Sequence, residues 1–131
     1  MNQFNKTQIS ATCLLLSVAD ADDKLEDNEI KIIQDILKDF FSIEQNVIEA
    51  LLNESKIRLN ESTDIFQFGN YLNKQFNQED KLDFICCIFE VAFADGDLHY
   101  LEHHTIKKIG NILNLDRNDI ISAKSEIQSY L

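Results

Sequence analysis

The sequence predicts an all-α protein of one domain, and three observations lead to that prediction. Apolar residues recur at helical spacing along most of the 131 residues, in stripes such as Ile9, Cys13 and Leu16. The chain contains no proline and three glycines, although sheet proteins need many tight turns that recruit these two residues. A short acidic motif occurs twice, each time between two helical stripes. One domain spanning residues 1–131 fits this length.

The apolar stripes and capping signals predict where each helix begins and ends. Asn77 and Asp116 stand at positions typical of N-caps, and Ser42 with Gln45 three residues later forms a capping-box pattern. The segment 53–64 is polar and weakly periodic, so we expect it to be a flexible connection. About seven helices are predicted, over residues 6–20, 27–41, 43–58, 63–76, 78–94, 99–114 and 117–130.

The chain contains an internal repeat. Residues 18–25, VADADDKL, match residues 91–98, VAFADGDL, at an offset of 73, and the same offset carries Glu29 onto Glu102. After about Phe40 the copies slip by one residue. The domain therefore divides into repeat one, a linker and repeat two, at about 6–52, 53–77 and 78–131. A duplicated chain of this kind usually folds with pseudo-two-fold symmetry, which predicts that the two acidic loops lie near one another around the axis.

Composition narrows the functional classes. The formal net charge is −11, and such a surface repels phosphate backbones, so we expect no nucleic-acid binding. The three cysteines are odd in number and lack a C-x-x-C pair, which favours small core residues in a reducing compartment. No apolar run approaches the roughly 20 residues of a membrane span, so no transmembrane segment is expected. The apolar stretch near Cys13 is too short for a secretory signal, and we expect a cytoplasmic protein.

Each copy of the repeat has the form V-A-x-A-D-x-x-L-x-x-x-E, and helix packing accounts for most of it. Small alanines allow helices to approach closely, and the aspartate is expected to end the first helix. Leu25 and Leu98 are predicted to be buried anchors beneath the loops. Glu29 and Glu102 fall in the first turn of the following helix, where a negative charge meets the helix dipole. Gly96 is expected to take a left-handed conformation after its helix.

The acidic residues of the two loops also allow a metal site. Carboxylates without basic partners nearby favour a hard cation, here calcium or magnesium. Asp22 and Glu29 would lie roughly 10 Å apart on a straight helix, so either the loop folds back or both copies contribute ligands. The alternative is that these acids cap helices and face water. The candidate metal ligands are Asp22, Glu29, Asp95, Asp97 and Glu102.

These loops resemble the hallmark of the tellurite-resistance TerB-like family, an A-D-G-x-[LIV]-x-x-x-E loop that opens a helix. Residues 94–102, ADGDLHYLE, match it closely, and residues 21–29, ADDKLEDNE, match it with Asp23 in place of glycine. The resemblance covers both halves of the chain. It implies an all-helical, pseudo-symmetric fold, a role in bacterial stress response without known catalysis, and divalent-metal binding by acidic residues. Carried over by position, those residues are Asp22, Glu29, Asp95 and Glu102.

Two motifs are similar to other sites but lack their requirements. The run 20–31 has Leu25 and Lys31 where a calcium EF-hand loop needs glycine and glutamate. Residues 99–103 spell H-x-x-E-H, a zinc-protease signature, but the repeat already accounts for Glu102. Adventitious zinc or nickel binding is the most we expect of His99, His103 and His104. No phosphate-binding glycine loop or nucleophile elbow occurs, so we expect no enzymatic activity.

The leading hypothesis is a non-catalytic acidic helical protein with a binding or scaffold role. It would respond to a divalent cation through its loops and act with an unidentified protein partner. The rival hypothesis is an acidic inhibitor or immunity-type protein that covers a basic partner protein, since charge steering serves that role equally well. The two hypotheses differ in where function lies, in the two loops for the first and over an exposed helical face for the second.

Overall fold

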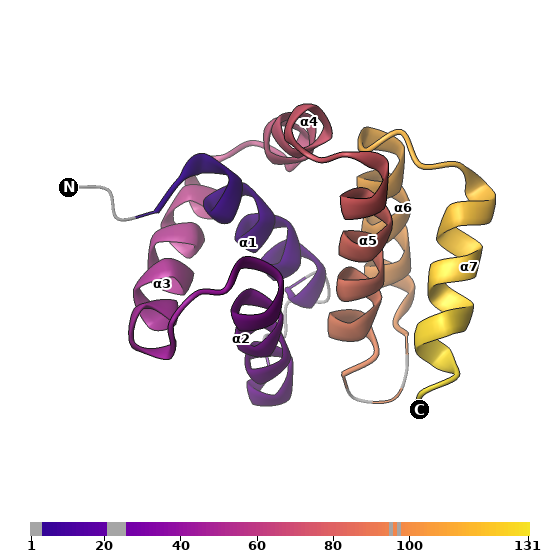
Figure 1. Ribbon diagram of the computed structural model, residues 1–131, viewed down its shortest axis with the longest axis horizontal. Helices are drawn as coiled ribbons and strands as arrows, with labels where there is room; N and C mark the ends of the chain where they lie inside the picture. The colour runs from indigo at the N-terminus through magenta and orange to yellow at the C-terminus, as the bar shows by residue number, and fades with distance from the viewer. Residues whose placement is uncertain (1–3, 21–25, 95, 97) are drawn as a thin grey trace.

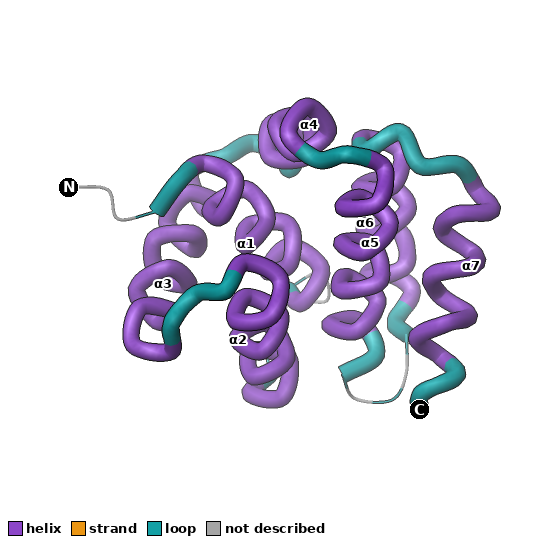
Figure 2. Tube along the Cα trace, viewed as in Figure 1, coloured by secondary structure: helices purple, strands orange, loops and turns teal. Residues whose placement is uncertain are grey.

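A computed structural model describes residues 4–20, 26–94, 96 and 98–131 of the chain. Within these residues the chain forms seven α-helices and no strand, which confirms the all-α prediction (Figure 1, Figure 2). Each helix lies within a few residues of its predicted range. The helices are α1 (Lys6–Ala19), α2 (Asp27–Phe41), α3 (Gln45–Glu61), α4 (Phe66–Gln75), α5 (Gln78–Ala92), α6 (Tyr100–Ile112) and α7 (Arg117–Gln128).

Helix α1 makes the most varied contacts in the fold. It packs against α2 and α3 of its own repeat, and also against α4, α5 and α6. Helix α5 contacts α2, α6 and α7. Figure 1 shows α1, α2 and α3 in one half of the molecule, α5, α6 and α7 in the other, and α4 across the top between them. None of the described helices is both long and apolar enough to cross a bilayer.

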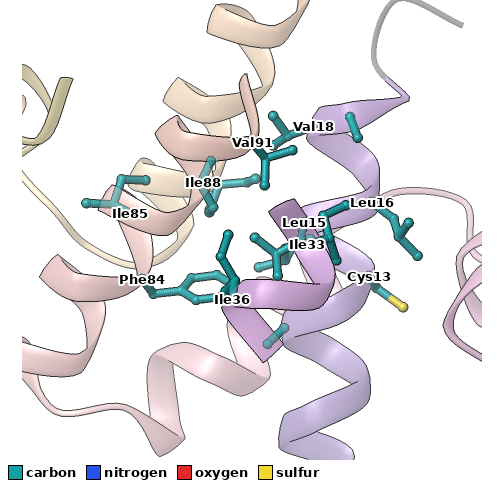
Figure 3. Close-up of a cluster of buried hydrophobic side chains, with 14 of the residues drawn as sticks. Cys13, Leu15, Leu16, Val18, Ile33, Ile36, Phe84, Ile85, Ile88 and Val91 are labelled. Carbon is teal, nitrogen blue, oxygen red and sulfur yellow. The ribbon is translucent and has the colours of Figure 1, made fainter. Parts of the chain in front are cut away.

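The buried side chains of both repeats meet in one cluster. Ten of the 14 residues of α1 are buried, on all sides of the helix, as in a helix that others surround. Figure 3 shows Leu15 and Val18 of α1 with Ile33 of α2 and with Ile88 and Val91 of α5. All five of these side chains are fully buried. The two repeats are thus joined through the α1–α5 contact by apolar packing, which is the main force that holds helices together.

Side-chain caps begin α5 and α7 as the sequence predicts. Asn77 Oδ1 accepts a hydrogen bond of 2.8 Å from the Asp80 N–H, and Asp116 Oδ1 accepts one of 2.8 Å from the Asp119 N–H. Each bond satisfies one of the amide donors that the first turn of a helix leaves unpaired. Both predicted N-caps are therefore confirmed.

The capping box predicted at Ser42 is wrong. Ser42 ends α2 in a left-handed conformation, with φ 55°, and Glu44 is the residue that precedes α3. Asn114 takes the same conformation after α6, with φ 60°. The next residues, Ile43 and Leu115, are both buried, and their N–H groups donate back to the ends of α2 and α6 at 3.4 and 2.9 Å. A residue in the left-handed conformation, followed by an apolar contact with the helix, is a common way for a helix to end.

These two turns are equivalent at an offset of 72 residues, one less than the offset of the loops, which agrees with the slip inferred from the sequence. In both repeats the first helix packs against the second and the third. The pseudo-two-fold relation between the repeats stays a prediction.

The segment 53–64 is not the flexible connection that its polarity predicted. Helix α3 continues through it to Glu61. Tertiary contact accounts for the difference, because Ser55 is fully buried against α1, where its carbonyl oxygen accepts a hydrogen bond of 3.4 Å from Cys13 Sγ. An ion pair between Arg58 and Glu54, with Nε and Oε1 3.1 Å apart, adds a smaller local contribution.

Candidate functional site

The two acidic loops connect α1 to α2 and α5 to α6. Helix α1 ends at Ala19 with Asp20 as its C-cap, and α5 ends at Ala92 with Phe93 as its C-cap. Both helices therefore stop three residues before the motif aspartate, and the prediction that this aspartate ends the helix is wrong. Gly96 has φ +93°, the left-handed conformation predicted for it, and its N–H donates to the Phe93 carbonyl oxygen at 2.8 Å.

The two motif glutamates occupy equivalent positions at the feet of the loops. Glu29 Oε1 accepts a hydrogen bond of 3.1 Å from the Glu26 N–H, and Glu102 Oε1 accepts one of 3.3 Å from the His99 N–H. Each glutamate is the third residue of its helix and reaches back to the residue before the helix, as in a capping box. The exposed fractions of Glu29 and Glu102 are 8% and 1%. The predicted placement in the first turn is confirmed, and both carboxylates are turned toward the protein interior.

The leucines between the acidic residues were predicted to be buried anchors. Leu98 packs against the core, as an anchor does, but it is only half-buried. It stands just before the start of α6, where the chain runs along the molecular surface and one side of the side chain faces solvent. Leu25 lies outside the described residues.

A hydrogen bond joins the start of α2 to the loop of the other repeat. Asn28 Nδ2 donates to the Ala94 carbonyl oxygen at 3.1 Å, across 66 residues of sequence. Asn28 immediately precedes Glu29, and Ala94 belongs to the motif of repeat two. This bond places the acidic end of α2 beside the second loop. In Figure 1 the lower ends of α2 and α5 accordingly face one another.

The structure places two of the five candidate metal ligands, Glu29 and Glu102. The other three, Asp22, Asp95 and Asp97, lie outside the described residues. Among the residues that the structure describes, no three His, Cys, Asp or Glu side chains are grouped so that they could hold a metal ion. One oxygen of each placed glutamate already accepts a backbone hydrogen bond. The described donors thus do not form a complete cation site, and the remaining ligands would have to come from the loop aspartates.

The H-x-x-E-H segment is built as a helix start. His99 precedes α6 and its N–H is bonded to Glu102, which accounts for the glutamate without catalysis. His103 is half-buried between α6 and α7, whereas His104 is exposed. A zinc protease needs its glutamate free to activate water, and a carboxylate that is 1% exposed and caps a helix does not meet that need.

The three cysteines differ in burial. Cys13 is fully buried, as predicted for a small core residue, whereas Cys86 and Cys87 are half-buried at the edge of the core. Burial raises the pKa of each thiol to about 12, and neighbouring carboxylates, among them Glu126 and Glu90, add to the effect at Cys86 and Cys87. These thiols are protonated at neutral pH and are poor nucleophiles.

Sequence reasoning missed an acidic groove between α2 and α5, here called the α2–α5 groove. It has a volume of about 340 Å³ and a base formed by Ile32, Ile36, Phe40 and Cys87. Its rim carries Asp35 and Asp39 from α2 and Asp83 and Glu90 from α5, all four exposed. Burial, and then the charge of Asp39, raise the pKa of Glu90. The i,i+4 spacing of Asp35 and Asp39 beside the stripe of Ile32 and Ile36 was the available signal, but which helix it faces depends on tertiary packing.

A comparison with protein-family models identifies the chain. The model of the tellurite resistance protein TerB matches residues 8–125. The chain belongs to the TerB family. Comparisons with curated proteins and with solved structures find no match.

The TerB match begins within α1 and ends within α7, so it includes both loops and the linker between the repeats. The resemblance read from the two short motifs is thereby confirmed over nearly the whole chain. Of the acids in the TerB-like motif, the structure places Glu29 and Glu102 at equivalent helix starts. The family match supports a tellurite-resistance-like helical protein.

Proposed function

We propose that this TerB-family protein is a non-catalytic binding or scaffold protein of bacterial stress response, cytoplasmic in location, whose paired acidic loops respond to a divalent cation. Calcium is the expected ion and magnesium a weaker one. The observation that supports this proposal best is the hydrogen bond from Asn28 Nδ2 to the Ala94 carbonyl oxygen, because it brings acids of both repeats to one end of the molecule. One loop alone would offer fewer oxygen ligands than the six to eight that calcium takes.

In this proposal the glutamates and the aspartates have different tasks. Glu29 and Glu102 hold the starts of α2 and α6 in place, each through Oε1, which accepts a backbone hydrogen bond beside the loop. Asp22, Asp95 and Asp97 supply the oxygens that come and go with the ion. Neutralising these carboxylates relieves their mutual repulsion, which stabilises the loops and the helix starts attached to them. A partner protein would then meet a different surface in the presence of the ion.

Thermal melts with calcium test the proposal. At a calcium concentration about a hundredfold above its Kd, binding stabilises the folded state by about 2.7 kcal/mol, which raises the Tm by about 10 °C for a chain of this size. The double variant Asp95→Asn, Glu102→Gln should lose this shift. Glutamine still caps a helix at the position of Glu102, so the variant removes charge and keeps the helix start.

Two controls separate a site from general screening. Sodium chloride at matched ionic strength should raise the Tm much less than calcium does. Screening depends on ionic strength and not on the identity of the ion, so any excess effect of calcium indicates specific binding. Glu49→Gln, at an exposed position of α3, should leave the calcium shift intact. If sodium chloride matches calcium, or if Glu49→Gln acts as strongly as the loop variant, the acids are a solvated surface and the proposal is wrong.

The α2–α5 groove favours a second candidate function, an acidic inhibitor or immunity-type protein that covers a basic partner. The groove combines an apolar base with four exposed carboxylates, which fits an amphipathic helix rich in lysine. A synthetic Lys/Leu amphipathic peptide is the probe. This candidate predicts that the peptide binds, that Asp35→Asn with Asp39→Asn abolishes the binding, and that calcium leaves the binding unchanged. That result would favour it over the cation-responsive protein.

A further inference from the structure

The charge of the chain is divided unevenly along the sequence. Residues 99–131 contain four Lys or Arg and four Asp or Glu, so the whole net charge of −11 lies in residues 1–98. The same C-terminal part contains His99, His103 and His104. Helices α6 and α7 therefore form a neutral to basic end on a strongly acidic protein.

Three of the four Lys and Arg residues of this end, together with His103, line one groove between α6 and α7, here called the α6–α7 groove. Its volume is about 520 Å³. Helix α6 contributes one face at i, i+4 and i+8, and α7 contributes one at i, i+3, i+4 and i+7, which are the spacings of residues on one side of a helix. The lining residues are His103, Lys107 and Asn111 from α6 and Arg117, Ile120, Ile121 and Lys124 from α7.

Two of the residues that line the α6–α7 groove, Ile120 and Ile121 of α7, are apolar. Ile120 lies over Gly110, where an added Cβ would be only 2.5 Å from Ile120 Cδ1, so the absence of a side chain at Gly110 lets α7 approach α6 here. Ile121 is 49% exposed, which is high for a large apolar side chain. The groove thus offers apolar contact beside basic side chains.

Among the residues that the structure describes, no ion pair neutralises the cations of this groove. The only ion pair within residues 4–20, 26–94, 96 and 98–131 joins Arg58 to Glu54, so Lys107, Arg117 and Lys124 form none there. His103, which shares the groove, has its pKa lowered first by burial and then by the charges of Lys124 and Lys107. An anionic ligand would offset these positive charges.

We propose that the α6–α7 groove docks an acidic amphipathic helix of a partner protein, with aliphatic side chains on Ile120 and Ile121 and carboxylates toward Lys107, Arg117 and Lys124. Charge complementarity argues for an acidic occupant, and the apolar side chains of Ile120 and Ile121 argue for an amphipathic one over a free oxyanion. The net charge does not prevent a short helix from docking, since charges beyond about 8 Å are largely screened at physiological ionic strength.

Calorimetry with a synthetic peptide tests this proposal. The probe is a Glu/Leu/Ala peptide with leucines on one face, and the control peptide has the same composition in scrambled order. The designed peptide should bind, and Lys107→Glu with Lys124→Glu should weaken it by at least about tenfold, since reversing charges at an interface commonly costs more than 1.4 kcal/mol. Ile121→Ser should also weaken it. Equal binding of the scrambled peptide, or no binding of either, would overturn the proposal.

A neighbouring lysine provides the matched control. Lys108 is exposed on α6, directly after Lys107, and does not line the groove. Lys108→Glu changes the net charge by as much as Lys107→Glu does, so it should leave peptide binding within about twofold if the groove is the site, since screening weakens distant charges. Equal losses from the two single variants would show general charge attraction and would overturn the proposal.

The imidazole of His103 supplies a second readout by NMR. A docked peptide should change the pKa of His103, which burial and then the charges of Lys124 and Lys107 lower in the free protein. Inorganic phosphate at the same concentration should produce a smaller change. If phosphate reproduces the change and displaces the peptide, the groove is a small-oxyanion site. If sedimentation shows self-association that Lys107→Glu abolishes, the occupant is a second copy. Either result overturns the proposal as stated.

Discussion

A methyl group added at Gly69 tests how tightly α4 packs on α6. A Cβ built on Gly69 would lie 2.6 Å from Ile112 Cγ2 and 3.2 Å from Ile112 Cβ. A Cβ contact under 3.0 Å forces something to move. Turning the Ile112 side chain gives little relief, because the Ile112 Cβ is itself close and is attached to the backbone of α6. The strain therefore has to be taken up by a shift of one helix against the other.

Two opposing effects set the size of the change in Gly69→Ala. Alanine in place of glycine within a helix stabilises by about 1 kcal/mol, and overpacking of a well-filled contact costs about 1–3 kcal/mol. We expect the free energy of unfolding to fall by about 1 kcal/mol, measured by urea melts followed by circular dichroism. In a background of Ile112→Ala the same substitution should be neutral or stabilising, and a double-mutant cycle gives this coupling directly.

Gly110→Ala is the matched control for this prediction. There the short contact is to Ile120 Cδ1 at 2.5 Å, the far end of a flexible side chain. Rotation of Ile120 into the α6–α7 groove relieves it, so the gain in helix propensity should keep the change within about 0.5 kcal/mol. If Gly69→Ala proves as stable as the unchanged protein and insensitive to Ile112→Ala, α4 does not pack on α6 at this contact.

Three further predictions follow from burial and charge. Burial raises the pKa of the thiols to about 12. A thiol reagent at mildly alkaline pH should therefore react at least about tenfold more slowly with the folded chain than with the chain unfolded in urea. Equal rates would contradict the burial of the thiols. The pKa of Glu90 is raised by burial and by Asp39, so its charge opposes folding at neutral pH, and this loss of stability disappears as the pH falls through the raised pKa. Glu90→Gln should therefore stabilise the protein by at most about 0.5 kcal/mol at neutral pH and by nothing in acid. Urea melts at the two pH values test this, and a larger stabilisation in acid than at neutral pH would contradict it. Leu98→Ala should cost about 1–2 kcal/mol in urea melts, less than the 2–5 kcal/mol of a fully buried leucine, because Leu98 is half-buried; a loss above about 3 kcal/mol would show a deeper anchor.

The sequence was sufficient for the fold wherever local signals and apolar periodicity agreed. The caps Asn77 and Asp116 and the left-handed Gly96 are encoded by single residues with short-range partners, and all three are confirmed. The start of α3 was missed because Ser42 can serve either as a cap or as a left-handed turn residue, and the burial of Ile43 selects the turn. That choice depends on a tertiary contact, which the sequence around Ser42 does not show.

The candidate site was predictable only in part. The repeat placed Glu29 and Glu102 correctly at two equivalent helix starts, because a capping position is defined within four residues of sequence. The hydrogen bond from Asn28 to Ala94 and the α2–α5 groove could not be predicted, since each joins segments that are distant in sequence. The α6–α7 groove depends on the angle at which both helices rest on α5, which apolar periodicity alone leaves open.

Calorimetric titration with calcium at constant ionic strength tests the central claim, that the paired loops respond to a divalent cation. We expect saturable heat with calcium and weaker binding of magnesium. We also expect loss of that heat in Asp95→Asn with Glu102→Gln and unchanged heat in Glu49→Gln, since Glu49 is exposed on α3. A titration in which neither ion gives saturable heat, or in which the loop variant binds as the unchanged protein does, would contradict the claim.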